Sequence, residues 1–290
     1  MNFAFFGNAE FSAIVLRKLL DAGLIPAAIV CAPDKPLGRK QILTPSPVKQ
    51  LIEKEPASLR DNLEIFQPGT KEELLAAADE LSSLHPDFFV VAAYPRIIPE
   101  SILRIPRLGT IGVHPSLLPR HRGASPIQTS VLEGDSTAGT SLFLMDEKVD
   151  HGPLITQQSL KNYDPNLATY EKLQKELAEL SGDLLVQNIP PFFNQETKPQ
   201  AQNESQATYT KKFSSDDGYV SGEDLESAQN SGGAAAREID RKIRALNPEP
   251  GVWTMQNGSR IKLLDAKIID GKLKLLKIQK EGKTPIQLPD

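Results

Sequence analysis

Residues 110–123 read TIGVHPSLLPRHRG and place one histidine, His114, where it could react. A short run rich in β-branched residues leads to His114, and a loop with two prolines and three basic residues follows it. Imidazole titrates near neutral pH and is the most common general acid or base in enzymes. A histidine after a strand can equally be packed or exposed without any chemical role, so position alone leaves both interpretations open.

A second reactive group follows the next predicted strand. The sequence MDEKVDHG places Asp146 and Asp150 directly after residues 140–145, which read as a strand. If this strand neighbours the one that ends at His114, the Asp150 carboxylate can orient or charge the imidazole, as general acid–base catalysis requires. The alternative is a solvated acidic turn, which is a common surface feature.

Other catalytic and cofactor patterns are missing from the sequence. The glycine after the first predicted strand stands in GNAEFS, which is neither a dinucleotide-binding G-x-G-x-x-G motif nor a phosphate-binding loop. Ser116 follows His114 by two residues and belongs to no G-x-S-x-G elbow, so a serine triad is not indicated. Four scattered histidines and one cysteine lack metal-ligand spacing, and we expect no metal.

A basic, proline-containing loop spans residues 34–49. It carries Lys35, Arg39, Lys40 and Lys49. Lysine and arginine supply most of the affinity of proteins for nucleic acids, which suggests an arm that contacts a phosphate backbone. A solvated connection between two elements is the alternative.

The elements around these residues predict an α/β protein. Short apolar strands at residues 2–6, 26–31, 87–94, 110–113 and 140–145 alternate with helical patterns at 11–22, 46–53, 72–84, 126–132 and 167–186. Such alternation predicts an open, mostly parallel sheet with helices on both faces, in which ligands bind beyond the carboxyl ends of the strands. His114 lies at such an end.

The last part of the chain reads as a separate, smaller domain. Residues 191–206 are mostly polar without apolar periodicity, and we predict a linker there between domains at residues 1–190 and 207–290. A helix is predicted at 234–245, and the hairpin turns Asn257-Gly258 and Asp270-Gly271 join three strands. About three strands fit, fewer than in a full five-stranded OB barrel.

Composition and charge describe a soluble protein with one basic end. The 290 residues are 39% hydrophobic and 24% charged, and no apolar run approaches the ~20 residues that span a bilayer. The single Cys31 fits a reducing cytoplasm, and the N-terminus reads as a strand rather than a signal peptide. Residues 251–290 hold eight Lys/Arg and four acids, so this end is +4 and the rest of the chain, at a total of −4, is −8. A basic C-terminal domain can meet a polyanion, or can simply carry solvated lysines.

Several of these motifs together resemble one family. The chain is similar to methionyl-tRNA formyltransferases in SLLPRHRG with the PIQ that follows, in MDEKVDHG, in KPLGR with TPSPVK, in ATYTKK and in IDRKIRALNPEPG. SLLP and the aspartate-containing turn are shared by formyltransferases generally, whereas the GR loop and the RALNP segment are more specific to the enzyme that acts on initiator tRNA.

The resemblance implies a fold and a reaction. It implies a Rossmann-like catalytic domain joined to an OB-like domain that binds tRNA. The implied reaction transfers the formyl group of 10-formyltetrahydrofolate to the amino group of methionine on initiator Met-tRNA. We expect a cytoplasmic monomer that binds folate and tRNA and no membrane.

The resemblance also implies residue roles. His114 and Asp150 match the catalytic histidine and aspartate of the family, whereas Gly112 stands at the position of the usual catalytic asparagine. Because residues i and i+2 of a strand share a face, an asparagine at 112 would aim its amide at the same point as His114. Thr110, Ser125, Thr140 or a water could take the place of that amide.

Binding residues are expected around this pair. The folate wall is expected at Ser116, Leu117, Leu118 and Pro119, with main chain of Val90, Val91, Ala92 and Ala93. The tRNA acceptor stem is expected to contact Arg39, Lys40 and Lys35. The alternatives are a formyltransferase for another amine such as an amino sugar, a hydrolase of formyl-folate, and a catalytically weak or silent tRNA-binding homologue.

Overall fold

The computed structural model describes residues 1–38 and 40–289, and the chain divides into two compact units. Unit 1 comprises Met1–Arg122, Gly139–Leu160 and Gln174–Thr208. Unit 2 comprises Gly123–Ala138, Lys161–Leu173 and the chain from Tyr209 onward. The stretch 191–206, which we predicted as a linker, therefore falls within unit 1.

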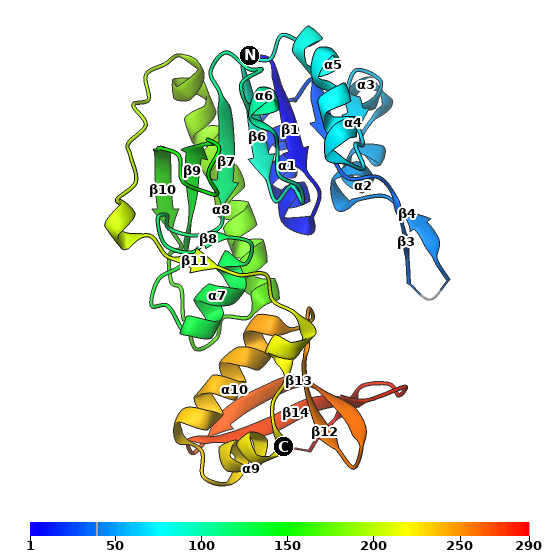
Figure 1. Ribbon diagram of the computed structural model, residues 1–290, viewed down its shortest axis with the longest axis vertical. Coiled ribbons are helices and arrows are strands. Elements are labelled where there is room, and N and C mark those ends of the chain that lie inside the picture. Colours follow the sequence, from blue (N-terminus) through cyan, green and yellow to red (C-terminus); the bar gives the residue numbers. More distant parts are fainter. Residues whose placement is uncertain (39, 290) are drawn as a thin grey trace. The chain divides into compact units, whose positions relative to one another are not determined.

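Unit 1 is built on a central sheet whose strand order is β10-β9-β7-β6-β1-β2-β5 (Figure 1). The strands are β1 (Phe3–Gly7), β2 (Ala28–Val30), β5 (Glu64–Phe66), β6 (Phe88–Ala92), β7 (Thr110–His114), β9 (Gly139–Leu144) and β10 (Leu154–Ser159). The strands from β7 to β5 are parallel. At the other edge β9 is antiparallel to both β7 and β10. The predicted fold class, a mostly parallel sheet with helices and a smaller C-terminal β-domain, is confirmed.

Helices cover both faces of this sheet. They are α1 (Glu10–Asp21), α2 (Pro47–Glu53), α3 (Ala57–Arg60), α4 (Lys71–Ala76), α5 (Ala78–Ser83), α6 (Glu100–Leu103) and α8 (Tyr170–Phe193), the last of which begins in unit 2. The single helix predicted at 72–84 is two helices, because α4 ends at Ala76 and the next residue, Ala77, leaves the helical range with φ and ψ of −79° and 1°. Phe192 of α8 contacts Phe88 edge-on, whereas the neighbouring Phe89 points to the opposite face, toward α4, α5 and α6.

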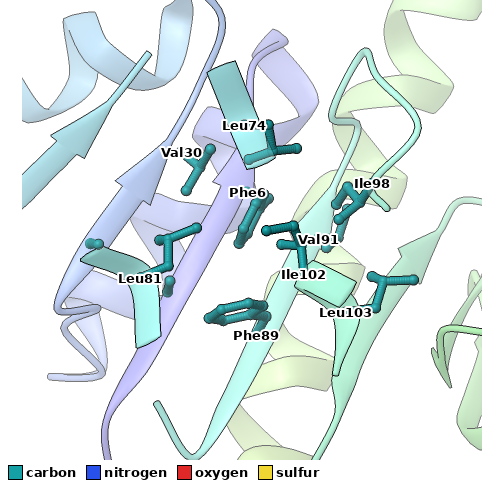
Figure 2. Packing of buried hydrophobic residues seen from close by; sticks show 11 residues of the cluster. Phe6, Val30, Leu74, Leu81, Phe89, Val91, Ile98, Ile102 and Leu103 are labelled. Atoms are coloured by element: carbon teal, nitrogen blue, oxygen red, sulfur yellow. The ribbon is translucent and has the colours of Figure 1, made fainter. Parts of the chain in front are cut away.

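The core under α4–α6 fixes the strands that end at the site. Phe6, Phe89 and Val91 of β1 and β6 pack against Leu74, Leu81, Ile102 and Leu103 of the three helices (Figure 2). Burial of each such side chain contributes about 1.5–3 kcal/mol. The cluster therefore holds β6, and through its ladder β7, at a fixed position.

The basic loop is a hairpin rather than an irregular connection. Strands β3 (Lys35–Leu37) and β4 (Ile42–Thr44) pair antiparallel. At the base of the hairpin, Lys49 Nζ contacts Asp34 at 2.9 Å, and Gln67 donates to Asp34 at 2.8 Å. These contacts fix both ends of the hairpin to the body of unit 1. Arg39 lies outside the described residues.

Unit 2 contains a four-stranded antiparallel sheet, as far as the chain is described, in the order β12-β13-β14-β15. Its main elements are α7 (Pro126–Glu133), α9 (Gly222–Asn230), α10 (Gly233–Leu246), β12 (Val252–Gln256), β13 (Ser259–Ile269), β14 (Lys272–Lys280) and β15 (Ile286–Gln287). Both predicted hairpin turns are present, with positive φ at Asn257, Gly258, Asp270 and Gly271. The short elements are β8 (Arg122–Gly123), β11 (Tyr209–Thr210) and the 3₁₀ turns Glu204–Gln206 and Ser215–Gly218.

The RALNP segment ties the helix of unit 2 to its sheet. Asn247 follows α10, donates to the carbonyls of Ile243 at 3.0 Å and Leu263 at 2.9 Å, and accepts from Val252 N. Arg244 donates to Asp240 within α10 and to the carbonyl of Pro165. These residues therefore have structural partners of their own. In the described part of the chain, no helix is both long and apolar enough to cross a bilayer.

Candidate active site

His114 is the last residue of β7 and is 5% exposed. Its Nε2 lies 2.8 Å from the carbonyl oxygen of His121. A carbonyl can only accept, so Nε2 carries the proton of this bond. The other ring nitrogen, Nδ1, faces Asp150, whose Oδ2 lies 3.5 Å away. One nitrogen is thus fixed to backbone, and the other is directed at a carboxylate.

The loop that carries Asp150 reaches His114 by folding back. Strand β9 is antiparallel to β7, with Ile111 paired to Leu144 and His114 paired to Ser141. The two strands are neighbours, as the prediction required, but the carboxyl end of β9 lies beside the start of β7. The structure nevertheless brings Asp150 to His114, because the residues between β9 and β10 return along β7.

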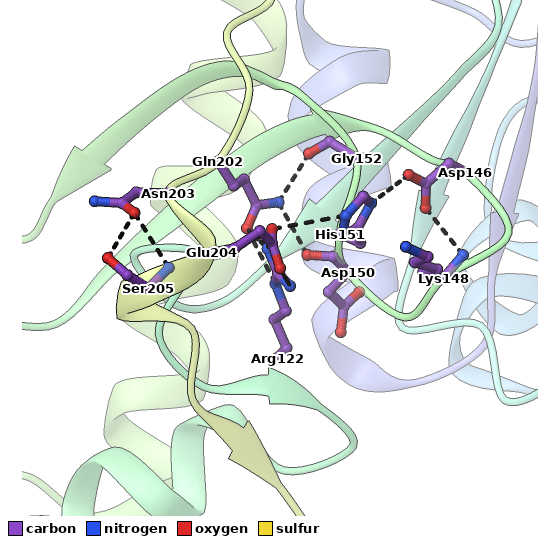
Figure 3. A network of polar contacts seen from close by, with 10 residues as sticks. All are labelled: Arg122, Asp146, Lys148, Asp150, His151, Gly152, Gln202, Asn203, Glu204 and Ser205. Atoms are coloured by element: carbon purple, nitrogen blue, oxygen red, sulfur yellow. Dashed lines mark hydrogen bonds and ion pairs between the residues drawn. The ribbon is translucent and has the colours of Figure 1, made fainter.

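Polar contacts hold this loop in shape (Figure 3). Asp146 accepts from the backbone N–H of Lys148 at 2.9 Å and contacts His151 Nδ1 at 2.6 Å. Asp150 itself has a φ of +50°, a left-handed conformation that is uncommon outside glycine. Such conformations persist where surrounding contacts determine them, and they cluster at functional sites.

A buried arginine lies behind the loop. Arg122 has no exposed surface, donates to Gln202 Oε1 from Nε and Nη2, and makes two bonds with the Glu204 carboxylate, the shorter at 2.6 Å. The guanidinium lowers the pKa of Glu204, mainly through this side-chain hydrogen bond. Sequence reasoning missed Gln202, Glu204 and His151. The polar composition of 191–206 suggested solvent exposure and gave no signal of these contacts.

Gly112 has no room for the side chain that the family resemblance implies there. A Cβ on Gly112 would lie 2.4 and 2.5 Å from two ring atoms of Phe143 and 3.0 Å from Met145 Cγ. Phe143 pairs with Gly112 across the β7–β9 ladder and is 2% exposed. The aromatic ring therefore fills the space that an asparagine amide would use.

The hydroxyls considered as replacements for this amide have other partners. Thr110 Oγ1 donates to the carbonyl of Leu103 at 3.0 Å. Thr140 Oγ1 donates to the carbonyl of His114 at 3.1 Å and contacts Ser181. Ser125 belongs to unit 2, where it precedes α7. Thr110 and His114 both share the strand face of Gly112, but the Thr110 hydroxyl is already bonded to Leu103, so His114 is the candidate donor on this face.

Most of the expected folate wall is buried. Ser116 and Leu118 are 5% and 3% exposed, and Ser141 Oγ bonds both, donating to Ser116 O and accepting from Leu118 N. Val90, Val91 and Ala92 lie in β6 within the core, whereas Ala93 is exposed with a φ of +45°. Leu117 and Pro119 are partly exposed.

An open cavity of about 710 Å³ lies at the amino end of β7, and its described lining includes neither His114 nor Asp150. Leu103, Leu108 and Met145 give it apolar walls. Its polar lining includes Arg104, Asp146, Glu147, Lys148 and His151. Its size falls within the range of about 300–1,000 Å³ that is usual for small-molecule sites.

The hairpin presents both charge and apolar surface. Lys35 and Lys40 are exposed. Leu37, Ile42 and Leu43 are also exposed, at 58%, 61% and 65%. Exposed apolar side chains beside lysines are typical of a surface that meets a partner.

Comparison with known proteins identifies the class. The formyl transferase family matches residues 1–189, and the C-terminal domain of formyl transferases matches residues 233–275. The chain therefore belongs to the formyl transferase family, and the predicted resemblance is confirmed.

Within this family, the chain is similar to methionyl-tRNA formyltransferases. The methionyl-tRNA formyltransferase of Marinobacter nauticus is 37% identical over 92% of this chain and 79% of its own length. The solved methionyl-tRNA formyltransferase from Clostridium thermocellum shares the fold, with a TM-score of 0.59 and 18% identity over 97% of this chain and 98% of its own. HypX from Aquifex aeolicus, solved with tetrahydrofolic acid, has a TM-score of 0.65 and 15% identity over 99% of this chain and 45% of its own.

Proposed function

We propose that this chain transfers the formyl group of 10-formyltetrahydrofolate to the amino group of methionine on initiator Met-tRNA, giving formylmethionyl-tRNA for translation initiation. The match to both regions of the family and the name of its 37% identical relative support the reaction and the acceptor. The observation that carries the proposal is the pair of buried His114 and half-buried Asp150, at 3.5 Å, in this family context.

The reaction needs a donor at a developing oxyanion and an acceptor for one proton. The methionine nitrogen attacks the formyl carbon, and the formyl oxygen takes the electron pair of the former double bond. The bond to N10 of the folate then breaks, and N10 is protonated as it leaves. Donors placed at such an oxygen are usually the largest single catalytic contribution.

His114 and Asp150 divide these tasks in our proposal. Nε2 of His114 is held by the His121 carbonyl, so the Nδ1 edge serves the reaction. A proton on Nδ1 is shared between Asp150 and the formyl oxygen. The methionine nitrogen attacks as the neutral amine, and Asp150 or a water accepts the proton that this nitrogen loses after attack. The same group returns that proton to N10 as the C=O bond forms again and the bond to N10 breaks. Because Gly112 supplies no amide, the Nδ1 proton is the main side-chain donor to the oxyanion.

We place the folate against the expected wall. The buried members, Ser116, Leu118 and Val90–Ala92, can offer only main chain, whereas Leu117, Pro119 and Ala93 can offer side chains.

The tRNA contacts Lys35, Lys40 and Arg39 of the hairpin in this proposal, and the basic strands of unit 2 add phosphate contacts. The lysines of β13 and β14 make the C-terminal part positive, which supports contact with a polyanion. We place the enzyme in the cytoplasm as a monomer.

The test is a formyl-transfer assay with charged initiator tRNA and 10-formyltetrahydrofolate at low salt. We expect transfer by the parent chain, and its loss in His114→Ala and Asp150→Ala with tRNA retention nearly unchanged. Folate consumed without formylated tRNA would indicate a hydrolase, and formylation of a nucleotide-linked amino sugar instead would indicate another acceptor. Tight tRNA binding with no transfer would refute the enzymatic proposal.

A further inference from the structure

We propose that Gln202 and Thr208 are positioning residues for catalysis: Gln202 holds the loop that carries Asp150, and Thr208 holds the residue whose carbonyl binds His114. The proposal rests on the proposed function, since it concerns the same two catalytic groups. All residues involved lie in unit 1.

The Gln202 amide is fully used and can adopt only one orientation. Its Nε2 donates to the carbonyl of Asp150 at 2.9 Å and to the carbonyl of Gly152 at 2.8 Å. Its Oε1 accepts from Nε and Nη2 of Arg122 at 3.1 and 2.8 Å. Two N–H donors and two acceptor directions are all that an amide possesses, and the side chain is 8% exposed.

These two bonds fix the backbone of the loop next to Asp150, the residue with the least favourable backbone conformation. The carbonyls that Gln202 binds stand on either side of His151, directly after the left-handed Asp150. The peptide dipoles beside Asp150 are therefore anchored by a side chain about 50 residues later in the chain. Without this anchor, the backbone at Asp150 can relax toward ordinary φ values, which would turn the carboxylate away from His114.

Arg122 and Glu204 hold the amide in place. The arginine is completely buried and joins Gln202 to the Glu204 carboxylate, so residues 202 and 204 are fixed to the same guanidinium (Figure 3). His151 Nε2 also lies 3.6 Å from Glu204. The side chains of Gln202 and Glu204 thus join their segment to the loop that carries Asp150.

Thr208 holds His121, the hydrogen-bond partner of His114. Its Oγ1 accepts from the backbone N–H of His121 at 2.8 Å, its N–H donates to Pro119 O at 3.2 Å, and its carbonyl accepts from Arg122 N at 2.9 Å. His121 is left-handed, with a φ of +60°, and its carbonyl is the one that fixes His114 Nε2. One short segment therefore orients the immediate partners of both catalytic groups.

The first test replaces Gln202 by an isosteric acid. Gln202→Glu keeps the contact with Arg122 and removes both donors to the loop carbonyls. Because a displacement of about 1 Å can cost on the order of 100-fold in rate, we expect kcat to fall roughly 10- to 100-fold. The KM values for tRNA and folate should stay within about twofold of the parent. The matched control is Gln206→Glu, the same chemical change at an exposed position of the same segment, which should leave all three constants unchanged.

The second test distinguishes the hydrogen bond of the Thr208 hydroxyl from the packing of the side chain. Thr208→Val removes the acceptor for His121 N–H, whereas Thr208→Ser keeps it. We expect kcat to fall in the valine variant and to recover in the serine variant. NMR provides a readout that does not require turnover: the Nε2 proton of His114 should exchange with water faster in Thr208→Val than in the parent or in Thr208→Ser.

Two outcomes would overturn the positioning role. One is an active parent whose Gln202→Glu and Thr208→Val variants keep its kcat and its His114 proton exchange. The other is a uniform loss, in which kcat, both KM values and the melting temperature change together, because that pattern indicates general support of the fold. A parent that transfers no formyl group would refute the proposed function instead, and the exchange measurement would still decide the positioning role.

Discussion

Restoring an amide at position 112 is the most informative perturbation of this site. An asparagine there would supply the oxyanion donor that Gly112 lacks, and one such donor is typically worth a factor of about 100–1,000 in turnover. The structure predicts that Gly112→Asn alone gives no gain. Its Cβ would lie 2.4 Å from the ring of Phe143, which is buried and cannot move without displacing its neighbours. Overpacking of this kind costs about 1–3 kcal/mol of stability.

A second substitution should make room for the asparagine side chain at position 112. Phe143→Met replaces the rigid ring by a flexible chain that can turn away from residue 112, and alone it should cost about 1 kcal/mol. In the double variant Gly112→Asn/Phe143→Met we expect kcat to rise at least about 10-fold, part of the full value of an oxyanion donor. The stability losses of the two single variants should not add, with a coupling of about 0.5–3 kcal/mol, since the residues are in contact.

The assay is single-turnover formyl transfer, combined with urea unfolding, on the parent, both single variants and the double variant. Gly112→Ala/Phe143→Met is the matched control, because it has the Cβ and the space but no amide, and it should not be faster than the parent. A stable Gly112→Asn protein with raised activity would refute the steric argument. A stable double variant no faster than its alanine control would refute the missing-donor argument.

Three further predictions concern the hairpin and unit 2. Lys35→Ala and Lys40→Ala should each weaken tRNA retention and reduce the magnitude of the slope of log affinity against log salt by about one. The control Lys71→Ala on α4 should change neither quantity. Unchanged slopes in the hairpin variants would exclude phosphate contact by the hairpin. Asn247→Ala should lower the free energy of unfolding by about 1–3 kcal/mol, because it leaves carbonyls of α10 and β13 without their donor, and urea titration of the full chain measures this. Hydrogen bonds from Lys211 and Ser214 lower the pKa of Asp217 from 3.8 to about 2. The contribution of Asp217 to stability is therefore complete above pH 3.8 and is lost as the pH falls toward 2. Unfolding curves of Asp217→Asn should lack this part of the acid dependence, and a pH profile identical to that of the parent would contradict the prediction.

The parallel part of the sheet and the candidate catalytic pair could both be predicted from the sequence, but for different reasons. The strands that became β1, β6 and β7 are continuous apolar runs, which local pattern detects directly. The meeting of His114 and Asp150 was predicted on the condition that the two strands are neighbours, and the antiparallel direction of β9 was not predicted. Residues 140–145 carry no local signal that distinguishes a parallel from an antiparallel partner, since that choice depends on the connection that precedes the strand.

The contacts around the pair could not be predicted in this way. Gln202 binds residues 50, 52 and 80 positions earlier, and it lies in a polar stretch whose composition is typical of a linker. The contact of Phe143 with Gly112 likewise depends on the register of β7 against β9. The departure at Gly112 was visible in the sequence, but the ring that fills its place was not.

The bond between Gln202 and the Asp150 loop also has a consequence for synthesis of the chain. A nascent chain that ends before residue 200 already contains every strand of the central sheet and both candidate catalytic side chains. It lacks Gln200, which bridges to Leu154 of the edge strand, as well as Gln202 and Thr208. The contacts that orient His114 and Asp150 therefore become available to the chain only after the whole central sheet has been synthesised.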